Sequence, residues 1–283
     1  MAISRREMLM CPAALAAGLA VGRLAMGAEA APAAETAMGG VKDASWWEAL
    51  NAKRVRCGLC PRKCEVADME RGYCGVRENR DGKYYTLVYG RPCAINVDPV
   101  EKKPLFHFLP GTKAYSIGTA GCNMECVFCQ NWNISQFRPE QVESVDLPPE
   151  KVIKRAAEAG CSSVAFTYNE PVIFSEYARD TAALGHEAGT PCVMISNGYI
   201  EREPTKELCG SLGAVKIDLK AFTEDFYRER CHGTLAPVKE TLKVLSGEGI
   251  WFEIVVLLVT GLNDSVDEVK RMSAWIVKEL GAD

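Results

Sequence analysis

The sequence lacks a surplus of positive charge: 37 acidic residues outnumber 33 lysines and arginines, and the formal net charge is −4. Proteins that coat nucleic acid normally carry a basic surplus, so no nucleic-acid partner is expected. Histidine is scarce, with three residues in 283, which argues against metal sites built on imidazole. The sequence also has no apolar run of the roughly 20 residues needed to span a bilayer, and no stable membrane span is expected.

The N-terminus has the order of a secretory signal. Arg5-Arg6 precedes an apolar run over residues 8–22, and small residues with Ala-x-Ala sites follow up to residue 33. The paired arginines resemble a twin-arginine export signal. Residues 1–33 are therefore predicted to be a signal that exports the chain to the periplasm, and 34–45 a linker. The alternative is an uncleaved anchor that leaves the protein at the cytoplasmic face.

Cysteine is abundant, with thirteen residues. Exported proteins usually oxidise their thiols, so a disulfide-rich binding protein is one possible interpretation. Disulfide scaffolds are usually short, however, and this chain is long enough to bury its own core. Twin-arginine signals are understood to carry folded, cofactor-loaded proteins, which favours metal-binding cysteines.

The chain is predicted to have an α/β fold. Residues 46–112 are rich in Cys, Gly, Arg and Pro, with one strand-like run at 84–88, and form a small cysteine-rich module. Strand-like runs at 114–118, 163–167, 192–196, 215–219 and 252–259 alternate with helical patterns at 149–159, 173–188, 205–212, 238–246 and 266–280. Such alternation is typical of parallel βα units. Residues 113–283 therefore form a core of five visible units, apparently cut before a sixth strand.

The strongest chemical signal is Cys122-x3-Cys126-x2-Cys129, directly after the first core strand. Cysteine thiolates are the usual ligands of iron–sulfur clusters, and three of them leave one iron of a [4Fe-4S] cube open. Structural zinc normally takes four ligands, and a ferredoxin-like run would need a fourth cysteine and a proline. Simple buried thiols are the remaining alternative.

This motif resembles that of the radical S-adenosylmethionine (SAM) superfamily, which implies a partial (β/α)6-type, TIM-like barrel. The resemblance implies that Phe128 packs on adenine and that Glu170, with Asn169 beside it, receives the methionyl amine. It also assigns SAM contacts to Ser196, Asn197, Asp218 and Lys220. All these residues follow core strands, where (β/α) barrels build their active sites. The motif around Glu170 lacks the two glycines that precede this glutamate in the superfamily.

One branch is more similar still. Cys57-x2-Cys60-x3-Cys64, Gly72-Tyr73-Cys74-Gly75, the run 98–104 and Cys129-Gln-Asn-Trp132 resemble AmmeMemoRadiSam-system enzymes, relatives of pyruvate formate-lyase activating enzyme. The resemblance implies reductive SAM cleavage, a 5'-deoxyadenosyl radical that abstracts hydrogen, and a low-potential electron donor of flavodoxin or ferredoxin type. The substrate, a protein or a small molecule, is not indicated. An iron–sulfur electron carrier or redox sensor without catalysis is the rival hypothesis.

A second set of cysteines, Cys57, Cys60, Cys64 and Cys74, makes a complete site of four thiolates. It could hold structural zinc or a second [4Fe-4S] cluster, and the sequence does not separate the two. Two disulfides are a third option. The other cysteines are interpreted as packing residues. For Cys231, in a loop after the fourth core strand, packing is favoured, and a position that faces the site is the alternative.

Overall fold

The computed structural model describes residues 40–281. The predicted signal, 1–33, and the first part of the predicted linker lie outside the described residues. All described residues belong to one compact unit. None of the helices within 40–281 is both long and apolar enough to cross a bilayer.

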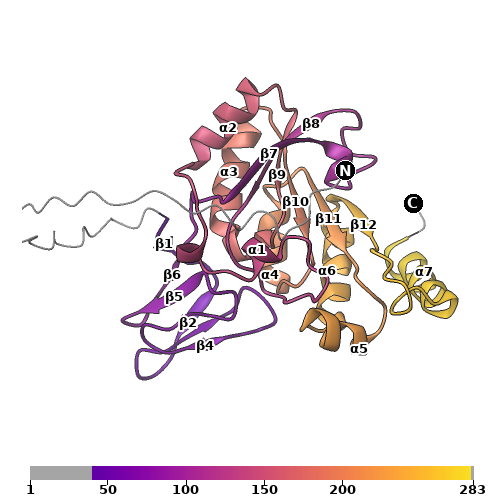
Figure 1. Cartoon of the computed structure of the whole chain (residues 1–283), viewed down its shortest axis with the longest axis horizontal. Helices are drawn as coiled ribbons and strands as arrows, with labels where there is room; N and C mark the ends of the chain where they lie inside the picture. The colour runs from indigo at the N-terminus through magenta and orange to yellow at the C-terminus, as the bar shows by residue number, and fades with distance from the viewer. Residues whose placement is uncertain (1–39, 282–283) are drawn as a thin grey trace, which may run out of the picture. The chain divides into compact units, whose positions relative to one another are not determined.

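The core is a six-stranded sheet in the order β12-β11-β10-β9-β8-β7 (Figure 1). Strands β8 to β12 run parallel, and β7 pairs antiparallel with β8 at one edge. The predicted α/β class and partial barrel are confirmed. The strands are β7 Ala94–Pro99, β8 Lys113–Gly118, β9 Ser163–Phe166, β10 Cys192–Ser196, β11 Ala214–Asp218 and β12 Trp251–Val255.

A helix follows each of the five parallel strands. The main helices are α2 Pro149–Glu158, α3 Ser175–Glu187, α4 Arg202–Cys209, α6 Leu235–Glu248 and α7 Val266–Leu280, with short α1 Trp132–Ser135 and α5 Glu224–Phe226. Capping residues in the sequence explain where two of these helices begin or end. Ser265 caps α7 by accepting a hydrogen bond from the amide of Glu268. Gly249, at φ 69°, ends α6 in the left-handed conformation that glycine adopts without strain.

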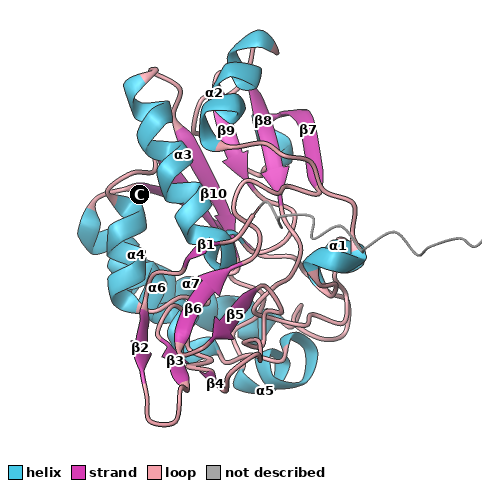
Figure 2. Cartoon of the chain, turned by 90° about the vertical axis from the view of Figure 1, so that its left-hand side faces the viewer, coloured by secondary structure: helices cyan, strands magenta, loops and turns pink. Residues whose placement is uncertain are grey.

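The two faces of the sheet differ. One face carries large apolar side chains, among them Ile117, Phe166 and Met194, which join the main core cluster. Helices α2 and α3 lie beside β9 and β10 (Figure 2). The other face carries small residues such as Ala114 and Ala165, which pack with Val100, Leu105 and Phe108 of the segment between β7 and β8. The segment between β7 and β8 thus covers part of this inner face of the sheet.

The residues before β7 form two small antiparallel sheets. Their orders are β1-β6-β5 and β2-β3-β4. All of these strands except β1 fall in the predicted cysteine-rich range, and β1 lies in the predicted linker. The strands are β1 Lys42–Asp43, β2 Trp47–Ala49, β3 Val55–Cys57, β4 Glu65–Val66, β5 Arg77–Arg80 and β6 Lys83–Thr86. Only β6 coincides with a predicted strand. Strand β7 also falls within 46–112, but it completes the sheet of the core.

Candidate functional site

Three cysteines lie together on the cysteine loop (residues 119–131), which leaves the carboxyl end of β8. Cys122, Cys126 and Cys129 have free, partly buried thiols. The amide of Met124 donates to Cys122 Sγ at 3.5 Å, and the amide of Cys129 donates to the carbonyl of Cys126 at 3.0 Å. Burial raises the pKa of Cys122, and the charge of Glu170 adds to that rise. The loop thus gathers three thiols at one edge of the sheet.

Asn169 braces the start of this loop from the end of β9. Its Nδ2 donates to the carbonyl of Gly121 at 2.8 Å, and its Oδ1 accepts from the amide of Thr119 at 3.1 Å. Contacts with the Thr119 hydroxyl and the Ala120 carbonyl complete the set. The sequence predicts a SAM contact for Asn169. In the structure its side chain is hydrogen-bonded to the start of the cysteine loop.

A buried pair of amides braces the middle of the loop. Asn197 Nδ2 donates to Asn123 Oδ1 at 2.9 Å, and Asn123 Nδ2 donates to the carbonyl of Tyr199 at 2.7 Å. Asn123 is completely buried and lies between two of the predicted ligands. Sequence analysis missed it, because an asparagine inside a cysteine motif carries no signal by itself.

Glu170 is buried at the junction of β9 and β10. Its carboxylate accepts from the Ser196 hydroxyl at 2.7 Å, the Asn197 amide at 2.7 Å and the Val172 amide at 3.1 Å. Burial raises the pKa of Glu170 to about 7 against these donors, which lower it. The structure therefore brings Glu170, Ser196 and Asn197 together, as their order along the chain predicts.

A line of charged groups lies at the end of β11. Lys216 donates to Asp218, and Lys220 Nζ lies 3.6 Å from the same carboxylate. Burial opposes the charge of Asp218, but the two lysines hold its pKa below the ordinary value. Lys220 also lies 5.9 Å from the ring centroid of Phe128, which packs on Phe226. Phe128, Asp218 and Lys220 thus share one side of the cysteine loop.

Cys231, for which sequence analysis favoured packing over a position that faces the site, lies beside the cysteine loop. It ends a π-helical turn, Tyr227–Cys231, a form that is rare and frequent at functional sites. The carbonyls of Arg230 and Cys231 accept from the amides of Val127 and Glu125. A hydrogen bond with the Cys231 thiol lowers the pKa of Cys126 to about 7. The buried Cys231 side chain is therefore a neighbour of one predicted ligand.

The second cysteine set, Cys57, Cys60, Cys64 and Cys74, lines one small enclosed cavity. The amide of Tyr73 donates to Cys64 Sγ at 3.4 Å. Hydrogen bonds of this kind are typical of thiolates that hold an iron–sulfur cluster.

The two cysteine sets are neighbours. Cys74 and Cys122 line the same cavity of about 530 Å³, and Asn123 lines the enclosed cavity of the second set. A side chain at Gly121 would overlap the carbonyl oxygen of Cys74. Because consecutive Cα atoms are 3.8 Å apart, the Cα atoms of Cys74 and Cys122 lie within roughly 10 Å. Within 40–281, no three Cys, His, Asp or Glu side chains are gathered around a position for a single metal ion.

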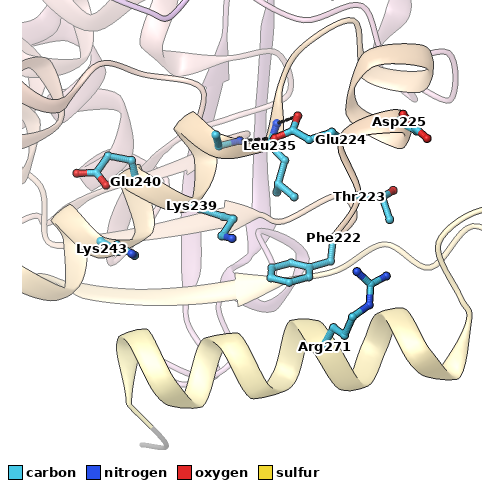
Figure 3. Close-up of a pocket in the computed structure, with 10 residues that line it drawn as sticks. Phe222, Thr223, Glu224, Asp225, Leu235, Lys239, Glu240, Lys243 and Arg271 are labelled. Carbon is cyan, nitrogen blue, oxygen red and sulfur yellow. Dashed lines mark hydrogen bonds between the residues drawn. The ribbon is translucent and has the colours of Figure 1, made fainter.

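A further cavity of about 560 Å³ lies between α5, α6 and α7 (Figure 3). None of the predicted site residues lines it. Its Glu224 accepts hydrogen bonds from the amides of Leu235 and Ala236, and so satisfies the first turn of α6. Glu224 therefore has a structural role at the start of α6, and no thiol lines this cavity.

Comparisons with known proteins agree with this geometry. The model of the radical SAM superfamily matches residues 116–276. The uncharacterized protein MJ0808 of Methanocaldococcus jannaschii is 42% identical over 241 residues, which cover 85% of this chain and 72% of that protein. The uncharacterized protein MJ0674 of the same organism is 33% identical over 196 residues, 67% of this chain and 51% of that protein, so the chain spans about half of its length.

Among solved structures, a domain of pyruvate-formate lyase-activating enzyme from Bacteroides vulgatus is similar, with a TM-score of 0.40 and 17% identity over 42% of this chain and 73% of that one. The match to the superfamily covers more than half of the chain, and it includes all three cysteines of the loop. The chain therefore belongs to the radical SAM superfamily of enzymes, whose members use a [4Fe-4S] cluster to cleave S-adenosylmethionine.

Proposed function

We propose that this chain is a radical SAM enzyme of the AmmeMemoRadiSam branch, similar in action to glycyl-radical activating enzymes. Cys122, Cys126 and Cys129 would hold its [4Fe-4S] cluster. One observation carries the proposal: the thiols of the cysteine loop share the carboxyl edge of the sheet with the predicted SAM contacts. These contacts are Phe128, Asn169, Glu170, Ser196, Asn197, Asp218 and Lys220.

When bound, the cluster supplies the electron that cleaves SAM to a 5'-deoxyadenosyl radical, which abstracts hydrogen from the substrate. The residues of the chain bind and orient SAM. Glu170, held by Ser196 and Asn197, presents a carboxylate to the methionyl ammonium group. Lys220 presents a cation to the SAM carboxylate, and the ring of Phe128 offers a face to adenine. Asn169 and Asn123 hold the loop that carries the thiols.

Two partners follow from this chemistry. The enzyme would need a low-potential electron donor, of flavodoxin or ferredoxin type. Its substrate is a protein or a small molecule, and the likeness to activating enzymes favours a protein by analogy only.

For the second cysteine set we favour a [4Fe-4S] cluster over structural zinc. The support is its position: Cys74 and Cys122 line one cavity and lie within roughly 10 Å, because Gly121 packs directly on Cys74. A cluster there could pass electrons to the first one. Zinc, which has no redox chemistry, would only hold the fold of residues 46–112.

Export by the predicted twin-arginine signal is a further part of the proposal. The support is the order of Arg5-Arg6, apolar run and Ala-x-Ala sites in residues 1–33. Fusion of these residues to a reporter that is active only in the periplasm tests it, with Arg5→Lys/Arg6→Lys as the matched control. Equal reporter activity from both fusions would contradict export by the twin-arginine route.

The central experiment is anaerobic reconstitution with iron and sulfide, followed by electron paramagnetic resonance (EPR) of the reduced protein with and without SAM. We expect SAM to change the spectrum of one cluster, and Cys126→Ala to remove that response. Cys209→Ala is the matched control, because it removes a thiol of α4 that belongs to neither cysteine set. This variant should respond to SAM like the wild type. A cluster spectrum indifferent to SAM would favour an electron carrier instead.

A further inference from the structure

Arg77 of β5 is a fully buried cation beside the second cysteine set. Its side chain is 1% exposed. Nη1 and Nη2 donate to the two carboxylate oxygens of Glu176 on α3, at 3.1 and 2.8 Å, and Nη2 also donates to the carbonyl of Ser45 at 2.7 Å. The backbone amide of Ser45 donates a hydrogen bond to Glu176 Oε1 at 2.6 Å. These bonds hold the guanidinium in one orientation.

The Nε–H of this guanidinium has no acceptor among the described protein atoms. Arg77 Nε is one of three buried side-chain nitrogen or oxygen atoms in the described part of the chain that lack a hydrogen-bond partner. Buried donors are almost always paired, and an orphaned one marks a ligand, an ion or water. Arg77 lines the enclosed cavity with Cys57, Cys64 and Cys74, so the orphaned donor belongs to the cysteine site.

The charge of that site matches the charge of Arg77. Four thiolates outnumber the positive charge of either a [4Fe-4S] core or a zinc ion, and leave the centre anionic. Tyr84, whose ring lies 5.6 Å from the guanidinium carbon, lines the same cavity. Because Glu176 already balances the charge of the guanidinium, the contribution of Arg77 to an anionic centre is chiefly the hydrogen bond of its unpaired Nε–H.

We propose that the Nε–H of Arg77 donates a hydrogen bond to a sulfur of an iron–sulfur cluster held by Cys57, Cys60, Cys64 and Cys74, and thereby raises the reduction potential of that cluster. The inference rests on the iron–sulfur assignment of the second site. Its physical reason is that a hydrogen bond and a positive charge both stabilise the more negative, reduced state. Arg77 is a positioning residue here, held by Glu176.

The first test isolates the second cluster with Cys122→Ala/Cys126→Ala/Cys129→Ala, reconstituted anaerobically with iron and sulfide. Arg77→Gln is introduced together with Glu176→Gln, so that no unpaired carboxylate is left in the core, and is compared with Glu176→Gln alone. We expect the midpoint potential to shift downward only when Arg77 is replaced. Arg80→Gln, which removes a partly exposed cation of the same strand that pairs with Glu78, should leave the potential unchanged.

A second test needs no change at Arg77. The same triple variant is labelled with guanidino-15N arginine, and pulsed EPR of the reduced cluster should detect a 15N coupling. Arg62 lines the same cavity, so the measurement is repeated with Arg62→Lys, and the coupling should persist.

The outcomes separate the two levels of the proposal. A triple variant that takes up no cluster would overturn both the iron–sulfur assignment and the role of Arg77. A cluster without 15N coupling, or with a potential indifferent to Arg77, would overturn the role of Arg77 and leave the assignment standing.

Discussion

Replacement of Asn169 by alanine tests how the cysteine loop is held. The side chain of Asn169 is 9% exposed and makes four hydrogen bonds, all to the segment Thr119–Gly121. Alanine removes them together. The amide of Thr119 and the carbonyl of Gly121 then lose their side-chain partner in a buried setting.

The magnitude follows from these two groups. A buried backbone group left without a partner costs about 1–3 kcal/mol, so we expect Asn169→Ala to lower the free energy of unfolding by about 3 kcal/mol. That is a large share of the roughly 5–15 kcal/mol that holds a folded domain together. Because the loop start loosens, the reconstituted variant should also lose iron faster than the wild type.

Urea denaturation of the metal-free chain measures the first effect, and iron content after repeated desalting measures the second. Asn133→Ala is the matched control, since Asn133 is exposed on α1 and its replacement should change stability by less than about 0.5 kcal/mol. The reasoning is refuted if Asn169→Ala keeps the stability and iron of the wild type and loses only the spectral response to SAM. Asn169 would then be a SAM contact and not a brace.

Two further predictions concern charged groups. Burial raises the pKa of Glu170 to about 7, and only the ionised carboxylate attracts the SAM ammonium group. The affinity for SAM should therefore fall by up to about tenfold per pH unit as the pH drops from about 8 to 6. An EPR titration with SAM measures this affinity. Glu170→Gln should bind more weakly at every pH and without this slope, and a flat wild-type profile would contradict the assignment. Asp98 accepts hydrogen bonds from Lys102, Lys103 and Tyr168, so Asp98→Asn leaves the buried Lys103 unpaired and should cost about 3–5 kcal/mol in urea denaturation. Asp81→Asn breaks an exposed pair with Lys53 and should cost far less than Asp98→Asn, because solvent screens exposed ion pairs. Equal losses would refute the argument.

The parallel strands were predictable because burial on both faces makes them continuous apolar runs. Strand β10 coincides with its predicted range, while β12 ends at Val255, four residues before the predicted end. Strand β7 was missed for a physical reason. It is an edge strand that places Asn96 and Asp98 among its residues and leaves Val97 44% exposed, so its sequence shows no apolar run.

The candidate site was likewise predictable only in part from the sequence. Local spacing was enough to bring Cys122, Cys126 and Cys129 onto one loop and Glu170 beside Ser196. It could not indicate Arg77 with Glu176, which are separated by 99 positions in the chain. Long-range pairs of this kind depend on how the elements pack, and no pattern within either segment reports them.

The two asparagines that hold the cysteine loop are direct neighbours in sequence of other residues predicted to contact SAM. Asn169 braces Gly121 and is followed by Glu170; Asn197 braces Asn123 and follows Ser196. Neighbours in sequence at the end of a strand share one backbone, so a shift that moves a brace also moves a predicted SAM contact. Three thiols on a loop keep a defined geometry only when the loop is held by its surroundings. Cluster geometry and SAM orientation therefore depend on the same strand ends, and the position of one constrains the other.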